Sequence, residues 1–274
     1  MIVPEGKSYS ANCEIVFFDD FSSEQLDRSK WNVRVTGRTV NNEQQAYVDS
    51  RDTIYIESGQ NSPGSDGHAL VLHPRYRPGY TTVEGDGFDF ISGRIDTREK
   101  CDFTYGIASA RMKLPAGTGL WSAFWAMGID KWPHSGEIDI MENIGEPDWT
   151  SAAVHGPTYF GENGLVNYKY FTHENDTTHW HTYAVDWSPD RLEFMVDDIL
   201  MYRVTRPMVA FHGEWVFDNP KFLILNFALG GTYPFKINGI QAPYYGISEE
   251  TVQKIKNDQA KVLVDWVRVT RPTT

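Results

Sequence analysis

The chain has 274 residues, a formal net charge of −12 and two cysteines. An acidic surface repels nucleic acid and highly sulfated polysaccharides, so neither is an expected partner. No run of about 18 apolar residues occurs, which argues against a membrane-spanning helix and a membrane partner.

Short runs of β-branched and aromatic residues predict strands along the whole chain. The predicted strands cover 14–18, 69–72, 107–114, 183–187, 192–196, 199–202, 221–227 and 261–269. The turn-forming residues 188–191 join two of these strands as a hairpin. One short helix is predicted near the C-terminus, over about 249–259, because Ser248 is a suitable N-cap and two glutamates open the first turn. Since no linker or repeat is visible, we expect one all-β domain over residues 1–274, a sandwich of two antiparallel sheets.

The first residues and the cysteines bear on where the protein works. Met1-Ile-Val-Pro-Glu5 lacks the basic and then apolar pattern of a secretory signal. We expect a secreted protein in its mature form, with an intracellular protein as the alternative. Cys13 and Cys101 could form a disulfide bond in an oxidising compartment or remain two buried thiols, and the sequence favours neither.

The segment from Trp132 to Ile144, Trp-Pro-His-Ser-Gly-Glu-Ile-Asp-Ile-Met-Glu-Asn-Ile, holds three acids in an apolar, strand-like frame. Burying an ionised carboxylate is costly, which suggests that the charges are used. Side chains alternate along a strand, so Glu137 and Asp139 share a face, whereas Glu142 lies at an odd offset. A β-bulge around Ile140-Met141 would return Glu142 to that face. The alternative is an edge strand with solvated acids.

The bulge also predicts a distance. With it, Glu142 lies in effect four strand positions beyond Glu137, and the two backbones are about 13 Å apart. Two glutamates that lean toward each other could bring their carboxyl groups to the roughly 5–5.5 Å of a retaining glycosidase, whereas an inverting enzyme needs a wider gap for a water molecule. The spacing therefore favours glycosidic bond cleavage with retention.

The flanks of these acids, Trp-Pro-x-x-Gly-Glu-Ile-Asp-Ile-Met-Glu-Asn, resemble the catalytic signature of glycoside hydrolase family 16. The bulged E-x-D-x-x-E form is typical of the laminarinase-like endo-β-1,3-glucanases of that family. Further segments resemble the family in the same order, at 41–47, 92–97, 105–106, 121–125, 181–187 and 264–269. The resemblance implies a β-jelly roll with a cleft across its concave sheet.

The resemblance also implies a role for each acid. Glu137 would be the nucleophile that attacks the anomeric carbon, and Glu142 the acid/base that protonates the leaving oxygen and then activates water. Asp139 would hydrogen-bond Glu137 and orient it. Neighbouring negative charge would raise the pKa of Glu142, so that it keeps its proton near neutral pH. No cofactor is expected for catalysis.

Two tryptophans in a neighbouring strand are expected to bind substrate. Trp121 and Trp125 are four residues apart, hence on one strand face, and could stack on successive glucose rings. The opposite face, with Phe124, is the better candidate for the core. By resemblance, Trp132 would wall the position nearest to the cleaved bond.

Three polar residues complete the expected substrate site. Asn41 and Arg94 match residues that line the cleft of the family, with a structural turn or salt bridge as the alternative. His155 would lie on the next strand and could reach the leaving-group sugar or Glu142, although a lone histidine is more often structural.

Two further patterns concern metal ions. Family members often carry a structural calcium ion on the convex face, and Asp265 with Glu14 and a carbonyl of the 59–67 loop would supply oxygen ligands. His179 and His181 have the spacing of a metal pair on one strand face. They lack an apparent third ligand, and we interpret them as structural.

Residues 235–260 are longer than the corresponding loop of typical laminarinases, and Tyr244 and Tyr245 could rim one end of the cleft. Three functions stay open. The first is a monomeric retaining endo-β-1,3-glucanase that acts on laminarin-like chains or mixed-linkage glucan. The second is a related hydrolase of galactan or agar. The third, a catalytically silent glycan-binding jelly roll, is disfavoured because all three acids are present.

Overall fold

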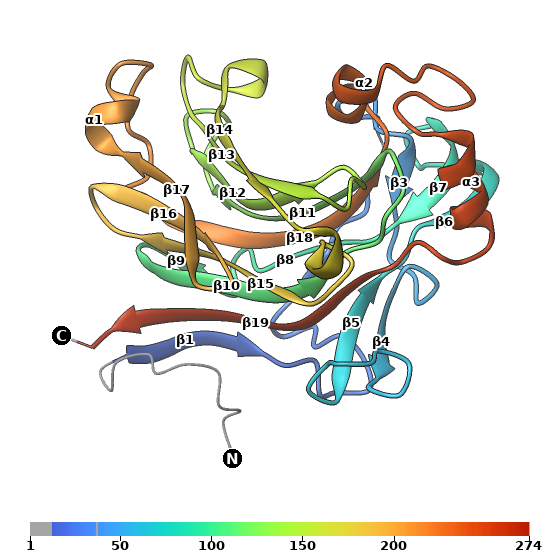
Figure 1. Cartoon of the computed structure of the whole chain (residues 1–274), viewed down its shortest axis with the longest axis horizontal. Helices are drawn as coiled ribbons and strands as arrows, with labels where there is room; N and C mark the ends of the chain where they lie inside the picture. Colours follow the sequence, from blue (N-terminus) through green and yellow to red (C-terminus); the bar gives the residue numbers. More distant parts are fainter. Residues whose placement is uncertain (1–12, 37, 274) are drawn as a thin grey trace.

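The computed structural model describes residues 13–36 and 38–273. Two antiparallel eight-stranded sheets pack face to face, and a third sheet of three strands lies at one end (Figure 1). The inner sheet is curved, and its concave side, which we call the hollow, faces the top of Figure 1. The predicted all-β sandwich of two antiparallel sheets is confirmed.

The outer sheet contains most of the predicted strands. Its order is β17 (Ile199–Thr205), β16 (Arg191–Val196), β15 (His181–Trp187), β10 (Gly106–Lys113), β19 (Val262–Pro272), β5 (His68–Leu72) and β4 (Ile54–Ser58), with β1 (Cys13–Asp19) beside β19. The hairpin at 188–191 is confirmed, because Trp187 pairs with Leu192 and the Ser188 amide donates to the Arg191 carbonyl.

The inner sheet forms the floor of the hollow. Its order is β14 (Leu165–Tyr170), β13 (Trp149–His155), β12 (Glu137–Asn143), β11 (Leu120–Gly128), β18 (Lys221–Leu229), β8 (Arg94–Asp96) and β2 (Asn32–Val33), with β9 (Asp102–Phe103) beside β18. Each of the eight predicted strands is present, with ends displaced by at most three residues.

The third sheet was not predicted. It contains β3 (Gln45–Tyr47), β7 (Gly87–Ser92) and β6 (Arg75–Thr81). β3 and β7 pair in parallel across more than forty residues of sequence, which local patterns do not reveal. β3 brings the 41–47 segment to the inner sheet, where the Gln45 side chain accepts from the Leu229 amide.

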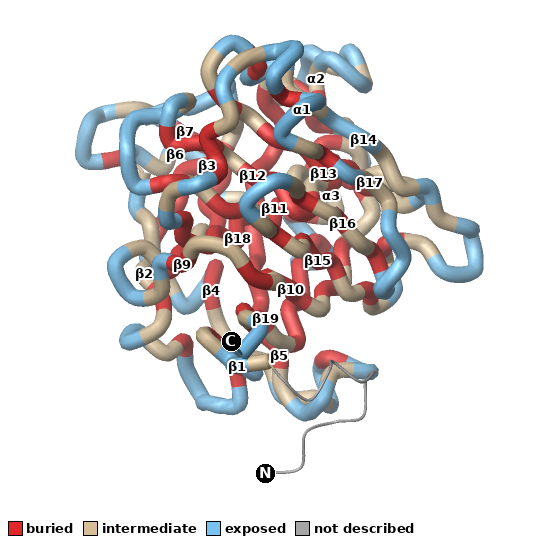
Figure 2. Tube along the Cα trace, turned by 90° about the vertical axis from the view of Figure 1, so that its left-hand side faces the viewer, coloured by how far each residue is buried: buried red, intermediate tan, exposed pale blue. Residues whose placement is uncertain are grey.

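The core lies between the two large sheets. Alternate residues of each strand point inward, and Leu223, Leu225 and Phe227 of β18 are fully buried there. Trp187 and Phe194 of the outer sheet are also fully buried. Buried positions follow the strands and exposed positions follow the connecting loops (Figure 2). This apolar layer holds the inner sheet rigidly beneath the hollow.

In the part of the chain that the structure describes, three short α-helices lie at the edges of the sandwich. The predicted helix is confirmed as α3 (Glu249–Lys256), and the Ser248 side chain caps it by accepting from the Thr251 amide. α1 (Arg206–Val209) follows β17, and α2 (Thr232–Asn238) follows β18 at the rim of the hollow (Figure 1). Two 3₁₀ turns, Gly161–Asn163 and His173–Asn175, lie in loops of the inner sheet.

Two predictions about the chain as a whole can be compared with the structure. Cys13 and Cys101 are free thiols rather than a disulfide, and burial raises the pKa of Cys101 to about 11. None of the helices among the described residues is long and apolar enough to cross a membrane. Residues 1–5, on which the prediction of secretion rests, lie outside the described residues.

Candidate active site

The three acids lie on β12, which contains the predicted bulge. Asp139 pairs with Trp125 of β11, and Met141 pairs with Phe124, so the register between the two strands skips Ile140. On the other side, the register between β12 and β13 shifts between Asp139 and the next acid. The bulge is confirmed at the expected position.

Because of the bulge, the acids of β12 share one face of the strand and its apolar residues share the other. Glu137, Asp139 and Glu142 all line the hollow above the inner sheet. Ile138, Ile140 and Met141 are fully buried in the core on the other face. Two neighbouring residues therefore point into the core, and this is what realigns the acids.

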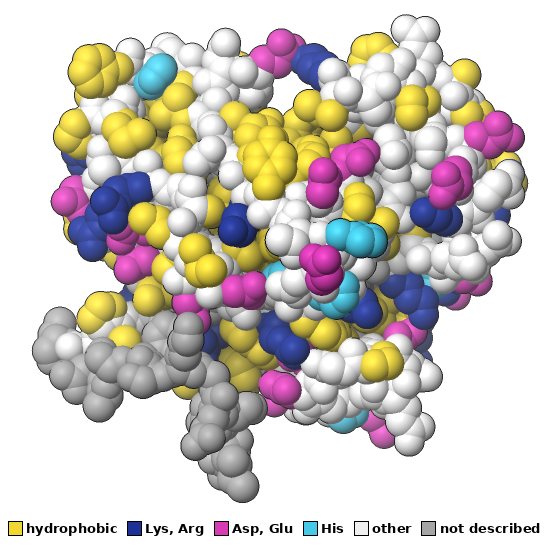
Figure 3. Space-filling model, viewed as in Figure 1, with side chains coloured by type: hydrophobic (Ala, Val, Ile, Leu, Met, Phe, Trp, Pro, Cys, Tyr) yellow, Lys and Arg dark blue, Asp and Glu magenta, His cyan; other side chains and the backbone are white. Residues whose placement is uncertain are grey.

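The hollow is a cleft with two halves that meet at the acids. One half has a volume of about 360 Å³ and the other about 430 Å³, and both are lined by Asn41, Trp121, Trp132, Glu137 and Glu142. The first, which we call the Arg94 half, also contains Arg94, Trp125, Asn226 and Glu43. The second, the His155 half, also contains His155, Tyr168, Tyr233, Glu162 and Lys236. Figure 3 shows a notch at the top of the molecule with hydrophobic side chains on its walls.

Burial and mutual repulsion keep protons on the acids. Burial, with the charge of Asp139 next, raises the pKa of Glu137 to about 8. Burial also raises the pKa of Asp139, with a contribution from Glu142, and burial raises the pKa of Glu142 itself. Three carboxyl groups in this space cannot all ionise near neutral pH, so they share protons as a set.

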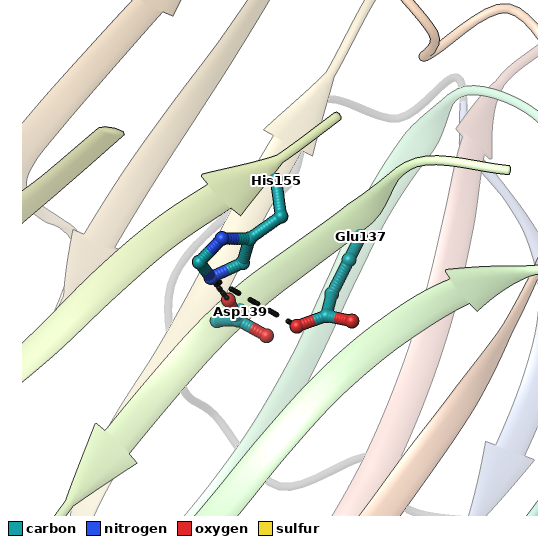
Figure 4. Close-up of side chains that lie close together, drawn as sticks. All are labelled: Glu137, Asp139 and His155. Atoms are coloured by element: carbon teal, nitrogen blue, oxygen red, sulfur yellow. Dashed lines mark ion pairs between the residues drawn. The ribbon is translucent and has the colours of Figure 1, made fainter. Parts of the chain in front are cut away.

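His155 lies opposite Glu137 in the register of β13 and β12. Its Nε2 is 3.1 Å from Asp139 Oδ2 and 3.9 Å from Glu137 Oε1 (Figure 4). The sequence suggested Glu142 as its partner among the acids, but the histidine side chain points to the other two. His155 is therefore placed to form an ion pair with Asp139 when its ring is protonated, but the contact lacks the alignment of a hydrogen bond.

The two tryptophans of β11 line the cleft from one strand face, as predicted. Trp121 Nε1 donates to Glu142 Oε1 at 3.0 Å, and this hydrogen bond lowers the pKa of Glu142 against the effect of burial. Trp125 Nε1 donates to Asn226 Oδ1 at 2.7 Å. The Arg94 guanidinium lies over the Trp125 ring, 5.1 Å from its centroid. Both indoles are thus oriented by specific contacts, and stacking on sugar rings stays a prediction.

The remaining predicted substrate residues lie on the rim. Trp132 is half-exposed, and its hydrogen bond to Glu137 lowers the pKa of that acid. Asn41 has a positive φ of 51°, and its carbonyl accepts from the backbone and the side chain of Thr232. Its backbone thereby ties the 41–47 segment to α2.

Several residues of the cleft were not predicted. Glu43 is largely buried, with its pKa raised by burial, and it accepts from Gln45 Nε2 at 2.8 Å. It belongs to the 41–47 segment, so its sequence context could have identified it. Tyr233 packs edge-on against Trp121, with ring centroids 5.5 Å apart, and it comes from α2, which was not predicted either.

The expected contribution of Tyr244 and Tyr245 is wrong. Tyr244 donates to Asp89 Oδ2 at 2.7 Å, and Tyr245 stacks on Phe235. Neither tyrosine is among the described residues that line the two halves of the cleft. The insertion reaches the cleft with its first part, α2, because the later part folds back against the third sheet.

The proposed calcium ligands do not form one site. Asp265 pairs with Arg111 and accepts from the Asp66 amide at 2.8 Å, so the 59–67 loop is indeed its neighbour. Glu14, however, lies opposite Arg271 in the register of β1 and β19. Arg271 is six residues away from Asp265 along β19. Because a guanidinium already neutralises Asp265, this donor set does not suit a cation.

Other potential metal ligands were also compared. His181 is structural as predicted, since its Nδ1 lies 2.7 Å from Asp197 Oδ2 and its Nε2 lies 2.9 Å from the Asp176 carbonyl. Among the described residues, Glu137, Asp139 and His155 bring one ligand atom each within 4.8 Å of one another. A cation held there would occupy a carboxylate oxygen of Glu137, which the acid needs for its own reaction. We therefore interpret this grouping as part of the catalytic acids and not as a metal site.

The sequence and the fold were compared with known proteins. The "Beta-glucanase" of Rhodothermus marinus is 32% identical over 94% of this chain and 85% of its own length. The "Glucan endo-1,3-beta-glucosidase A1" of Niallia circulans is 30% identical over 94% of this chain, which spans only 38% of that protein. Among solved structures, the endo-beta-1,3-glucanase from Pyrococcus furiosus superposes with a TM-score of 0.81 at 29% identity, covering 99% of this chain and all of that one.

A family model, Glycosyl hydrolases family 16, matches residues 38–268. The match includes β12 with its three acids, both tryptophans of β11 and His155. It agrees with the resemblance on which the sequence-based expectations rest. The chain therefore belongs to glycosyl hydrolase family 16.

Proposed function

We propose that this protein is a retaining endo-hydrolase of internal β-1,3-glucosidic bonds in laminarin-like β-glucans. The observation that carries the proposal is the bulge of β12, which turns Glu137 and Glu142 to the same cleft at the place where its two halves meet. A bond bound across that junction has sugar-binding space on both sides, as an endo-acting enzyme requires. The β-glucanase and endo-1,3-glucanase names of the relatives support the choice of substrate.

The proposed reaction has two steps. Glu137 attacks the anomeric carbon, and Glu142 gives its proton to the departing glycosidic oxygen, which leaves a glycosyl ester on Glu137. Glu142, now ionised, then takes a proton from water, and the resulting hydroxide displaces Glu137 from the anomeric carbon. Attack twice at the same carbon retains its configuration.

Asp139 is proposed to control the protonation state of Glu137 in this scheme. Glu137 has to be ionised to attack, yet its pKa of about 8 favours the protonated form in the free protein. Asp139 is almost fully buried, and burial raises its pKa, whereas its hydrogen bond with Glu137 acts in the opposite direction and lowers it. We propose that the proton shared in this hydrogen bond moves from Glu137 to Asp139 when substrate binds, so that Glu137 becomes ionised next to a neutral partner.

The scheme uses carboxyl groups and water alone, and it needs no catalytic cofactor. We also propose that the protein acts as a monomer, because a single chain supplies the acids and the lining residues of the cleft. We place its action outside the cell, since a polymer of this kind does not cross a membrane unaided.

The proposed reaction is tested by incubation with laminarin, lichenan and agarose. We expect new reducing ends from laminarin first, with products of mixed length, and the β-anomer as the first product detected by proton NMR. Release of reducing ends from agarose alone would favour the galactan or agar alternative. If none of the three polymers yields reducing ends, both hydrolase functions are wrong.

The assignment of Glu137 is tested by Glu137→Gln. The amide cannot form the glycosyl ester, so we expect kcat to fall by at least about 10³-fold while oligosaccharide binding, measured by calorimetry, persists. Glu174→Gln, at an exposed position in the 3₁₀ turn before β15, is the control and should match the wild type. Near-normal turnover by Glu137→Gln would refute the assigned nucleophile.

A further inference from the structure

The loop between β13 and β14, residues 156–164, leans over one half of the cleft. At its centre, Phe160 packs edge-on against Trp132, with ring centroids 5.2 Å apart. At its end, Gly164 passes so close to His155 that an added Cβ would lie 2.3 Å from the imidazole ring. The loop is therefore held against two residues of the cleft, Trp132 and His155.

α2 forms the opposite wall and is also fixed in place. Thr232 at its start donates twice to the Asn41 carbonyl, at 2.7 Å from its backbone and 3.0 Å from its side chain. One residue later, Tyr233 packs against Trp121. Figure 1 shows the loop above β13 and β14 on one side of the hollow and α2 on the other.

One ion pair joins these two walls. Glu162 extends from the loop, Lys236 extends from α2, and the carboxylate and the ammonium group are in contact. Both side chains line the His155 half of the cleft. The Glu162 side chain is 76% exposed and that of Lys236 is 39% exposed, so the pair lies at the mouth of this half and not at its floor.

We propose that the pair Glu162–Lys236 is a latch that restricts which glucan chains enter the His155 half. An unbranched chain fits beneath the joined side chains, whereas a sugar branch that projects from the main chain meets them. Substrates with branches on this side must first separate the pair. This inference rests on the proposed function, and it assigns both residues to substrate selection rather than to chemistry.

The strength of the pair agrees with a latch. Exposed ion pairs are weak and are further weakened by salt, so this one can open without disturbing either wall. Its effect on rates should accordingly be modest. We expect its removal to change the preference between branched and unbranched substrates by roughly two- to fivefold.

The test uses the ratio of kcat/KM for a soluble β-1,3-glucan with single β-1,6-linked glucose branches to kcat/KM for a linear β-1,3-linked hexasaccharide. Lys236→Met and Glu162→Gln should each raise this ratio two- to fivefold, and the exchanged pair Glu162→Lys/Lys236→Glu should return it toward the wild-type value. High salt should raise the wild-type ratio and leave the ratio of the single variants unchanged. Glu250→Gln removes another exposed pair, Glu250–Lys254 on α3, and serves as the matched control.

The possible outcomes separate the two proposals. If the wild type cleaves both substrates but neither single variant changes the ratio, the latch is wrong and the proposed function stands. A change in only one of the two variants, or no return in the exchanged pair, also overturns the latch, because the effect would then belong to one side chain. If the wild type cleaves neither substrate, the proposed function fails and the latch with it.

Discussion

Glu137 and Glu142 are both half-buried and lie on the same strand face, yet their neighbours differ. Glu137 faces Trp132, His155 and Asp139, whereas Glu142 accepts from the Trp121 indole. The hydrogen bond from Trp121 stabilises the ionised form of Glu142 and so lowers its pKa. This is the group that has to alternate between acid and base in the proposed reaction.

The Trp121 contact leads to a prediction about pH. Trp121→Phe removes the donor, so the pKa of Glu142 should rise further, and the basic limb of the kcat/KM profile should move to higher pH. We also expect kcat/KM at the optimum to fall by roughly tenfold, because the hydrogen bond also orients the carboxyl group.

The chain offers a matched control for this substitution. Trp125→Phe removes an indole that donates to Asn226, which does not titrate, so the rate can change but the basic limb should stay in place. A profile recorded over pH 4–10 distinguishes the two variants. If the basic limb of Trp121→Phe is unchanged, the Trp121 indole does not influence the pKa of Glu142 and the prediction is wrong.

The raised pKa of Glu137 has a consequence for stability. An unfolded glutamate loses its proton near 4.5, whereas Glu137 in the folded protein keeps it to about 8. Between these values the folded state binds more protons than the unfolded state, so the stability contributed by this group is complete below pH 4.5 and is lost as pH rises through about 8.

Glu137→Gln tests whether Glu137 makes the folded protein less stable as the pH rises. The amide does not titrate, so the melting temperature of the variant should exceed that of the wild type by an amount that grows from pH 4.5 to pH 8. We expect a gain of at least about 2 °C at the upper end, measured by differential scanning calorimetry. Glu174→Gln should show no such trend, and a parallel pair of curves for Glu137→Gln would contradict the raised pKa.

At the scale of elements, Lys221 at the start of β18 joins two loops to the core. Its ammonium group is fully buried and donates to the Ser135 carbonyl at 2.8 Å, the Val216 carbonyl at 3.2 Å and Asn219 Oδ1 at 2.7 Å. The group also lies over the rings of Trp187 and Phe217. Ser135 comes two residues before Glu137, so this contact helps to fix the entry into β12.

Lys221→Met should therefore affect both stability and catalysis. Methionine preserves much of the apolar stem but leaves two buried carbonyl groups without their donor, and we expect a loss of about 2–4 kcal/mol in the free energy of unfolding. In material that remains folded, kcat should fall because Glu137 is less well positioned. Urea denaturation and kinetics measure the two effects, with Lys254→Met, at a half-exposed position on α3, as the control.

The elements that sequence patterns predicted are those set by local rules. Strand alternation placed the bulge of β12, and capping chemistry placed α3 with Ser248 as its N-cap. α2 escaped prediction because it is only seven residues long and is held by contacts from distant segments, such as the Asn41 carbonyl. Short helices of this kind depend on their surroundings more than on their own sequence.

The site residues also fall into those that local rules predict and those that depend on contacts between distant segments. The three acids and the tryptophans of β11 were predicted because each group lies on a single strand, where parity decides the face. The partner of His155 and the grouping of Glu14 with Asp265 depend on register between strands, which one sequence does not specify. Tyr233 reaches the cleft from the first turn of α2, a helix that is held in place by contacts with distant segments.

At the scale of the whole molecule, Asp265 and Arg111 link the outer sheet to the 59–67 loop. Arg111 also donates to the Gly64 carbonyl at 2.9 Å, so one guanidinium joins three chain segments. An internal cation of this kind performs the task that a structural calcium ion would perform.

This arrangement predicts independence from calcium. Treatment with EDTA should leave the melting temperature within about 2 °C of its value in millimolar calcium, and activity should not change. Arg111→Gln, by contrast, should destabilise the protein because the buried Asp265 carboxylate loses its partner. A large drop in melting temperature on chelation, reversed by added calcium, would show that a metal site exists after all.

Because of the bulge in β12, the number of residues between Glu137 and Glu142 does not by itself determine how the two acids are arranged. Without Ile140, Glu137 and Glu142 would be four residues apart, which is an even offset, and both would still face the cleft. The reaction depends on positions along one face of the strand, whereas the extra residue serves only the hydrophobic side. Sequences with E-x-D-x-E or E-x-D-x-x-E spacing can therefore present the same arrangement of acids, and a search for such sites should compare strand faces rather than residue intervals.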